Sequence, residues 1–216
     1  MSLLKPSGPN PIAAKTPPIV AILRGVKHDE IVDIAAALVE AGIEAIEVPL
    51  NSPDPLVTIG KLCAAFGDKV LCGAGTVLSP EAVDQVAGVG GKLIVTPNID
   101  AAVISHAVSL GLTVMPGFAT PSEAFVAVKA GAKALKLYPA GTYGFGHIKA
   151  VRDVLPKDIA VYAVGGVGSA NLKPWIEAGV AGIGVGGELY RPGYTAQEVG
   201  QRARTLVAAW NELTAQ

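Results

Sequence analysis

The sequence has few of the residues that mark disulfide-stabilised, nucleic-acid-binding or membrane-spanning proteins. It contains 2 cysteines in 216 residues, which excludes a disulfide framework or a cysteine-rich zinc site, and we expect a cytoplasmic location. Only 16% of the residues are charged and the formal net charge is −1, so neither nucleic acid nor an anionic membrane surface would be attracted. No run approaches the roughly 20 apolar residues that a membrane span needs.

Aromatic residues are also scarce, at 5%, although half of the residues are hydrophobic. The core must therefore be built from alanine, valine, isoleucine and leucine, which favours helices packed on a parallel sheet over an all-β sandwich. The 26 glycines fall at the ends of expected elements and form no low-complexity run.

Short apolar runs alternate with helix-like stretches along the chain, and each apolar run predicts a strand. The runs are Ile19–Leu23, Ala45–Val48, Val70–Cys72, Leu93–Val95, Leu112–Met115, Ala134–Leu137, Ala160–Val164 and Gly182–Val185. Eight such units in about 200 residues predict a single-domain (β/α)8 barrel over residues 19–216. A six-stranded doubly wound sheet is the competing interpretation. Residues 1–18, which are rich in proline, are expected to form an N-terminal leader.

Lys136 stands out as a charged residue inside one of these apolar runs. Because side chains alternate along a strand, Leu135 and Leu137 should face the helices while Lys136 faces the barrel interior. Burial should lower the pKa of this amine from about 10.4 towards roughly 7–8, and a neutral amine can attack a ketone. The alternative is a lysine that reaches the strand end and pairs with a carboxylate.

Glu47 occupies a similar position, sharing the inward face with Ala45 while Ile46 and Val48 face outwards. A carboxylate near a buried lysine could transfer protons to a carbinolamine and to a substrate hydroxyl. The alternative is a structural ion pair with Lys136. Desolvation offsets much of the attraction within a buried pair, so the pattern favours a catalytic role.

Two further polar residues follow strands, at the barrel end where active sites form. Arg24 ends the first run, and its guanidinium suits a carboxylate or phosphate, although a salt bridge at the rim is equally compatible. Thr76 follows the third run in a glycine-lined segment, where its hydroxyl could bind a carboxylate.

Glycine pairs follow the last two strands, at Gly165 and Gly166 and at Gly186 and Gly187. Glycines at these two loops let backbone N–H groups approach an anion, and these loops are the frequent phosphate site of this fold. The alternative is tight turn geometry alone. The three histidines are far apart in the sequence and show no metal-ligand spacing, so we expect them to be surface or capping residues and predict no metal site.

Several segments together resemble the class I 2-keto-3-deoxy-6-phosphogluconate and 2-keto-3-deoxy-6-phosphogalactonate aldolases. They are PIVAILRG, EAIEVPLNSP, GAGTVL, LIVTPN, MPGFATPSEA, ALKLYPA and AVGGV. The resemblance implies that Lys136 forms the Schiff base, that Glu47 is the general acid and base, and that the remaining site residues bind substrate. These are Arg24, Asn51, Thr76, Pro139 and Val164, with Gly165, Gly166, Gly186 and Gly187 holding phosphate.

Three positions bear on which branch of this family the chain resembles. Asn51 and Val164 replace an arginine and a threonine typical of the gluconate branch, and Asn51 matches the galactonate branch. A threonine at 164 could bond a substrate C4 hydroxyl, whereas valine cannot. Gly187 stands where the galactonate branch commonly has serine, which removes one hydroxyl donor for phosphate.

The resemblance implies cleavage of 2-dehydro-3-deoxy-6-phosphogalactonate to pyruvate and glyceraldehyde 3-phosphate, as in galactonate degradation. It also implies that no cofactor is needed and that the chain forms a homotrimer. The gluconate epimer or 4-hydroxy-2-oxoglutarate is an alternative substrate. The residues are also compatible with a phosphate-binding barrel isomerase or synthase that forms no imine, and with a non-catalytic sugar-phosphate sensor.

Overall fold

The computed structural model describes residues 11–12 and 17–215, and in this part of the chain nine parallel strands form one sheet. The order of hydrogen-bonded neighbours is β5-β4-β3-β2-β1-β9-β8-β7-β6. The strands are β1 (Ile19–Ile22), β2 (Ala45–Pro49), β3 (Leu71–Gly75), β4 (Leu93–Val95), β5 (Thr113–Met115), β6 (Gly117–Phe118), β7 (Ala134–Leu137), β8 (Ala160–Val164) and β9 (Gly182–Val185).

The two ends of this sheet, β5 and β6, are consecutive in the chain and are separated only by Pro116. The N–H of Thr96 donates to the carbonyl of Met115 on one side, and the N–H of Lys136 donates to the carbonyl of Pro116 on the other, at 2.9 Å. One interrupted strand therefore closes the sheet into a barrel, which rules out the doubly wound alternative. The predicted strand Leu112–Met115 was too short, because it omitted β6.

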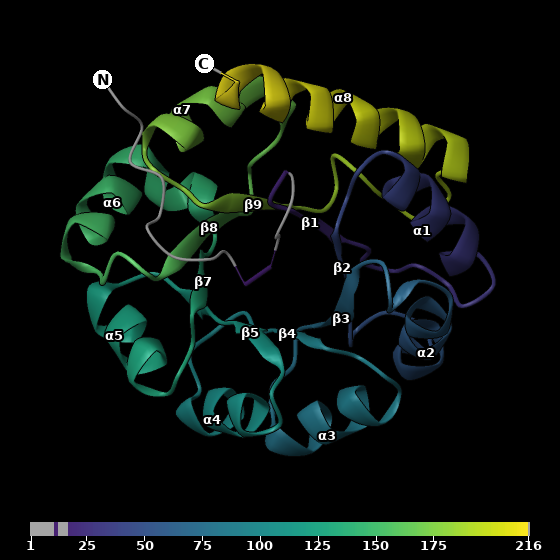
Figure 1. Cartoon of the computed structure of the whole chain (residues 1–216), viewed down its shortest axis with the longest axis horizontal. Coiled ribbons are helices and arrows are strands. Elements are labelled where there is room, and N and C mark those ends of the chain that lie inside the picture. The colour runs from purple at the N-terminus through teal and green to yellow at the C-terminus, as the bar shows by residue number, and fades with distance from the viewer. Residues whose placement is uncertain (1–10, 13–16, 216) are drawn as a thin grey trace.

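Helices surround the strands in chain order, as an outer ring in Figure 1. They are α1 (Ile31–Glu40), α2 (Pro55–Phe66), α3 (Pro80–Gly88), α4 (Ala101–Ser109), α5 (Pro121–Lys129), α6 (Ala140–Val154), η1 (Ser169–Asn171), α7 (Leu172–Glu177) and α8 (Ala196–Thr214). Ser79 caps α3 and Thr120 forms a capping box with Glu123 at α5, as proline at the first helical position predicts. The described helices include none long and apolar enough to cross a membrane.

Two layers of buried side chains confirm the alternation read from the sequence. Leu135, Leu137 and Ile46 belong to the cluster that the strands share with the helices. Ala134 and Ala45, one residue away, belong to a separate cluster that fills the barrel interior. The sequence thus places Lys136 and Glu47 on the inward face of the barrel.

The expected leader falls mostly outside the described residues, since 1–10 and 13–16 are not described. Within it, Ile12 is buried and belongs to the interior cluster with Val20 and Tyr162. The carbonyl of Pro18 accepts a hydrogen bond from Ile183 N at 3.0 Å. Ile12 therefore packs against the residues that fill the barrel interior, and Pro18 extends the pairing between β1 and β9.

Candidate active site at the carboxyl end of the barrel

The residues predicted from the sequence come from six consecutive strands of the sheet, β3-β2-β1-β9-β8-β7. Each of these residues lies near the carboxyl end of its strand or in the loop that follows. Because the strands are parallel, these positions meet at one end of the barrel, where the active sites of this fold are built. The fold thus brings together residues that are up to about 160 positions apart in the chain.

Lys136 lies on β7 with its side chain in the barrel interior and only 6% exposed. Burial lowers the pKa of the amine from 10.5 to about 8, while the Glu47 carboxylate opposes this change and Arg24 adds to it. The Nζ atom lies 4.9 Å from the centre of the ring of Tyr138, which directly follows β7 and is exposed. With a pKa of about 8, roughly a tenth of this amine is neutral at pH 7, far more than for an ordinary lysine, and the neutral form is the one that attacks a ketone.

Glu47 lies on β2 and is 3% exposed. A Cβ atom on Gly75 would come within 1.9 Å of Glu47 Oε2, so the glycine of β3 makes the space for this carboxylate. Burial raises the pKa of Glu47 from 4.5 to about 7, although Lys136 and Arg24 lower it. Its Oε2 atom is buried without a hydrogen-bond partner among the described residues. A carboxyl group with these properties can both donate and accept a proton near neutral pH.

The relation between the two groups bears on the ion-pair alternative. Each changes the pKa of the other electrostatically, so they face a common space. Yet the ion pairs within 4.0 Å found among residues 17–215 do not include Lys136 with Glu47. A structural ion pair would satisfy both charges by direct contact, and the observed arrangement leaves Glu47 Oε2 unsatisfied instead.

Arg24 follows β1 and is exposed, and its guanidinium donates a hydrogen bond to the side-chain oxygen of Asn51 in the loop after β2. The neighbouring Ser52 is buried, and its hydroxyl accepts a hydrogen bond from Gly25 N at 2.9 Å. Asn51 and Ser52, in the loop after β2, therefore hold the loop after β1 that carries Arg24. Ser52 was not predicted as a site residue, because a serine in a turn gives no pattern that reveals its partner.

Thr76 adopts a backbone φ of 57°, the left-handed conformation that residues other than glycine rarely adopt. It directly follows Gly75, which packs on Glu47. Strained residues of this kind persist where the surrounding structure fixes them, and they are concentrated at functional sites. The geometry thus supports the expectation that Thr76 lies in the site.

An apolar wall closes the interior beside β9. Val164, the last residue of β8, is 3% exposed, and Ile22 of β1 lies next to it. A Cβ atom on Gly184 would meet Val164 at 2.8 Å and Ile22 at 3.4 Å, so this glycine separates the two side chains. Ile22 was missed from the sequence because it is indistinguishable from the other apolar strand residues.

The two glycine pairs lie on neighbouring loops, after β8 and β9. Gly165 and Gly166 have φ values of 89° and 78°, which require glycine, and Gly165 accepts a hydrogen bond from Gly141 N at 2.8 Å. Pro139 precedes α6, and its atoms approach a Cβ built on Gly165 at 3.4 Å. This packing places Pro139, the start of α6 and the first glycine loop side by side.

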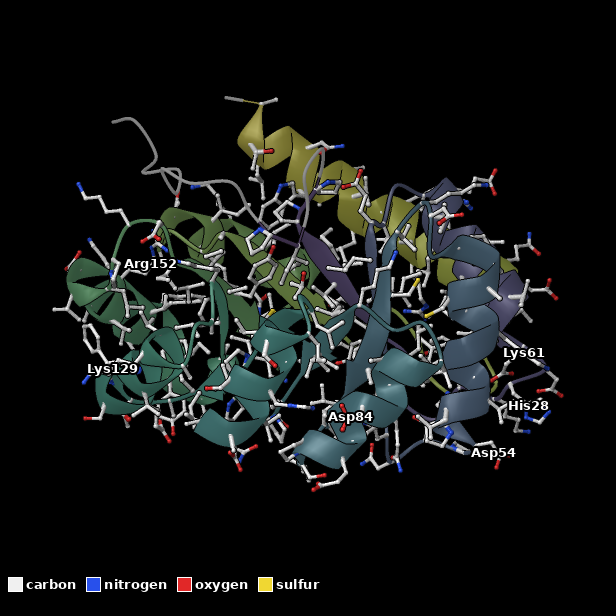
Figure 2. All side chains as sticks on the ribbon, turned by 60° about the horizontal axis from the view of Figure 1, so that its bottom comes forward. His28, Asp54, Lys61, Asp84, Lys129 and Arg152 are labelled. Atoms are coloured by element: carbon white, nitrogen blue, oxygen red, sulfur yellow. The ribbon has the colours of Figure 1, made fainter. Side chains whose placement is uncertain are left out.

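The histidines lie in unrelated places. His28 accepts a hydrogen bond from Lys61 at its carbonyl, 2.9 Å away, and its ring lies 3.9 Å from Asp54; Figure 2 shows these three residues together beside α2. His106 contacts Asp84 at 2.7 Å, and His147 contacts the carbonyl of Ala119 at 2.6 Å. In the described part of the chain, no group of three or more histidine, cysteine, aspartate or glutamate residues is placed to hold a metal ion.

Comparisons with known proteins show which family the chain resembles in sequence and fold. The family model for KDPG and KHG aldolase matches residues 12–202. The 2-dehydro-3-deoxy-6-phosphogalactonate aldolase of Escherichia coli K12 is 51% identical over 195 residues, which cover 90% of this chain and 95% of that protein. A Rhizobium meliloti protein named "Probable 2-dehydro-3-deoxy-6-phosphogalactonate aldolase" is 44% identical, covering 93% and 95%. A solved structure described as "Native KDPGal structure" superposes with a TM-score of 0.92 at 50% identity, covering 94% and 98%.

Proposed function

The chain belongs to the KDPG and KHG aldolase family, and we propose that it is a Schiff-base aldolase that reversibly cleaves 2-dehydro-3-deoxy-6-phosphogalactonate to pyruvate and glyceraldehyde 3-phosphate. The observation that carries this proposal is the buried Lys136 amine, with its pKa lowered to about 8, facing the same interior space as Glu47. The names of the two similar curated proteins support the galactonate substrate.

The first half of the reaction forms the imine. The neutral Lys136 amine attacks the C2 ketone and gives a carbinolamine. The pKa of Glu47 is about 7, so about half of this carboxyl group is protonated at neutral pH. The protonated form donates its proton to the departing hydroxyl, which leaves as water. The product is a protonated imine that withdraws electrons from the C3–C4 bond.

The second half breaks the carbon–carbon bond. A base removes the C4 hydroxyl proton, the C3–C4 bond breaks, and its electrons form an enamine with the imine nitrogen, releasing the aldehyde. Protonation of the enamine at C3 and hydrolysis release pyruvate and restore Lys136. Glu47 suits these proton transfers because its Oε2 atom has no partner within the described structure. The imine accepts the electrons, and no step of this proposal calls on a cofactor.

The remaining site residues orient the substrate in this proposal. Arg24 and Thr76 lie next to Glu47 and suit the substrate carboxylate, while the glycine loops after β8 and β9 suit the phosphate at the other end. Asn51 fixes Arg24, and Val164 presents an apolar wall where the gluconate branch has a threonine hydroxyl. The homotrimer remains a prediction from the resemblance, and the cytoplasmic location remains a prediction from the low cysteine content.

Trapping with pyruvate and borohydride tests the imine directly. Reduction should add one pyruvate-derived group to the protein, and digestion followed by mass spectrometry should place it on Lys136. Lys136→Ala should form no adduct and lose cleavage while keeping its fold. Lys133→Ala is the matched control, because the Lys133 side chain is exposed and pairs with Asp158 away from the site, so this variant should react normally. Cleavage by Lys136→Ala within tenfold of the unaltered protein would exclude the imine on Lys136. An unaltered protein that forms no adduct and does not cleave the substrate would favour an isomerase, a synthase or a sensor.

The epimer at C4 tests the narrower assignment. We expect kcat/KM for the phosphorylated galactonate compound to exceed that for the gluconate epimer by about tenfold to a few hundredfold. An apolar wall discriminates by only about 1–3 kcal/mol, so the preference should not be exclusive. A preference for the gluconate epimer would leave the aldolase mechanism intact and assign the chain to the other branch.

A further inference from the structure

A carboxylate joins the two glycine loops that the proposed function assigns to phosphate. Glu188, directly after Gly187 in the loop that follows β9, accepts hydrogen bonds from the N–H of Ser169 at 2.9 Å and from its hydroxyl at 2.6 Å. Ser169 begins η1 in the loop that follows β8. Both bonds involve a charged acceptor, which makes them stronger than bonds between neutral groups.

The chain is fitted around this carboxylate. A Cβ atom on Gly168 would lie 1.3 Å from Glu188 Oε2, so only glycine leaves room for the carboxylate in its present position. The φ of Gly168 is −168°, an extended conformation open to any residue, so a side chain at 168 would conflict with the position of the Glu188 carboxylate and not with the backbone conformation. Gly168 is buried by this contact although the Glu188 side chain is exposed.

Each loop is also held by hydrogen bonds within itself, so a contact between the two loops fixes the position of one relative to the other. In the first loop, the side chain of Asn171 donates to the carbonyl of Gly166 at 2.8 Å and accepts from Gly168 N at 3.0 Å. In the second loop, Arg191 donates to the carbonyl of Gly187 at 2.9 Å. Glu188 crosses from one fixed loop to the other.

We propose that Glu188 is a positioning residue that sets the separation of the two glycine loops and thereby the preference for a phosphorylated over a non-phosphorylated 2-oxo-3-deoxy sugar acid. This inference rests on the proposed function and on the phosphate role of the loops. The negative charge of Glu188 opposes a phosphate, but this exposed carboxylate is screened by solvent and already accepts two hydrogen bonds. The effect on loop geometry therefore outweighs the repulsion.

The experiment compares kcat and KM for the 6-phosphorylated substrate and for its non-phosphorylated counterpart in four variants. Glu188→Ala should lower the preference for the phosphorylated substrate about tenfold, mainly through its KM. Glu188→Gln keeps an oxygen acceptor for Ser169 N–H and should restore the preference to within about threefold. Gly168→Ala should expel the carboxylate and reproduce Glu188→Ala. The double variant Gly168→Ala/Glu188→Ala should lose no more of the phosphate preference than either single variant, because both changes remove the same link between the loops.

Three results would overturn the inference. They are an unchanged preference in Glu188→Ala, additive losses in the double variant, and a stronger phosphate preference in Glu188→Gln, which would mean that the charge dominates. Pyruvate trapping on each variant separates this failure from failure of the proposed function. Adducts with an unchanged preference refute only the role of Glu188, whereas no adduct in the unaltered protein refutes both.

Discussion

Replacing the buried lysine should make the protein more stable while it abolishes the reaction. Lys136→Met keeps the length of the side chain and removes its charge. The pKa of Lys136 falls from 10.5 to about 8 on folding, mainly because burial penalises the ammonium. This difference corresponds to roughly 3 kcal/mol, since one pKa unit equals about 1.4 kcal/mol. Below pH 8 the buried lysine is mostly protonated, and the free energy of unfolding is lowered by this full amount.

The cost should disappear in a defined pH range. Between pH 8 and 10.5 the unfolded chain binds the lysine proton and the folded protein does not, so stability rises with pH across this window. Loss of the cation also removes an attraction that favours ionised Glu47, which will then take up a proton more readily. We therefore expect a net gain of roughly 1–3 kcal/mol at pH 7, which is about 3–10 °C in Tm for a chain of this size.

Thermal and urea unfolding at one protein concentration, at pH 7 and again near pH 10, measure this gain. Lys133→Met is the control, because its exposed ion pair with Asp158 should contribute at most about 1 kcal/mol. The gain of Lys136→Met should shrink at the higher pH as the wild-type lysine becomes neutral. A variant less stable than wild type at pH 7, or a gain that is equal at both pH values, would refute the reasoning.

Three further predictions concern activity. Glu47→Gln should keep the fold and lower the cleavage rate roughly 10²–10⁴-fold through loss of proton transfer, and a loss below about fivefold would assign that role elsewhere. Val164→Thr, nearly isosteric, should shift the kcat/KM ratio towards the gluconate epimer, and an unchanged ratio would remove residue 164 from substrate discrimination. Imine formation with pyruvate should peak between about pH 7 and pH 8, because Glu47 and Lys136 then share one proton on average; a rate that stays flat from about pH 6 to about pH 9 would contradict this.

The strands and the inward residues could be predicted because their signals are local. Alternation within a run of four or five residues places Lys136 and Glu47 on the inward face, and the structure confirms the two layers through Leu135 and Ala45. The rule that sites form at the carboxyl ends of barrel strands then gathers residues from distant segments. The helix starts at Ser79 and Thr120 are also marked locally, by the proline that follows each of them.

The features that were missed depend on neighbours distant in the chain. Pro116 ends β5 because it has no N–H, yet its carbonyl still accepts from Lys136 N, so the strand resumes as β6. No local pattern shows that a serine at 52 binds Gly25 N, or that a glycine at 168 makes room for Glu188. In each case the partner is set by the packing of neighbouring barrel loops.

Three unfavourable features of the described chain lie at the carboxyl end of the barrel, and that placement supports a functional role for them. Thr76 has a left-handed backbone, Glu47 Oε2 is buried without a partner in the described structure, and Lys136 is an ammonium held in an apolar interior. Each lowers stability, and the apolar layer between strands and helices must offset their sum. A fold under selection for stability alone would replace these groups, as Lys136→Met does. Their shared position is explained if the same groups must meet one substrate, because functional sites are where a fold departs from the rules that favour stability.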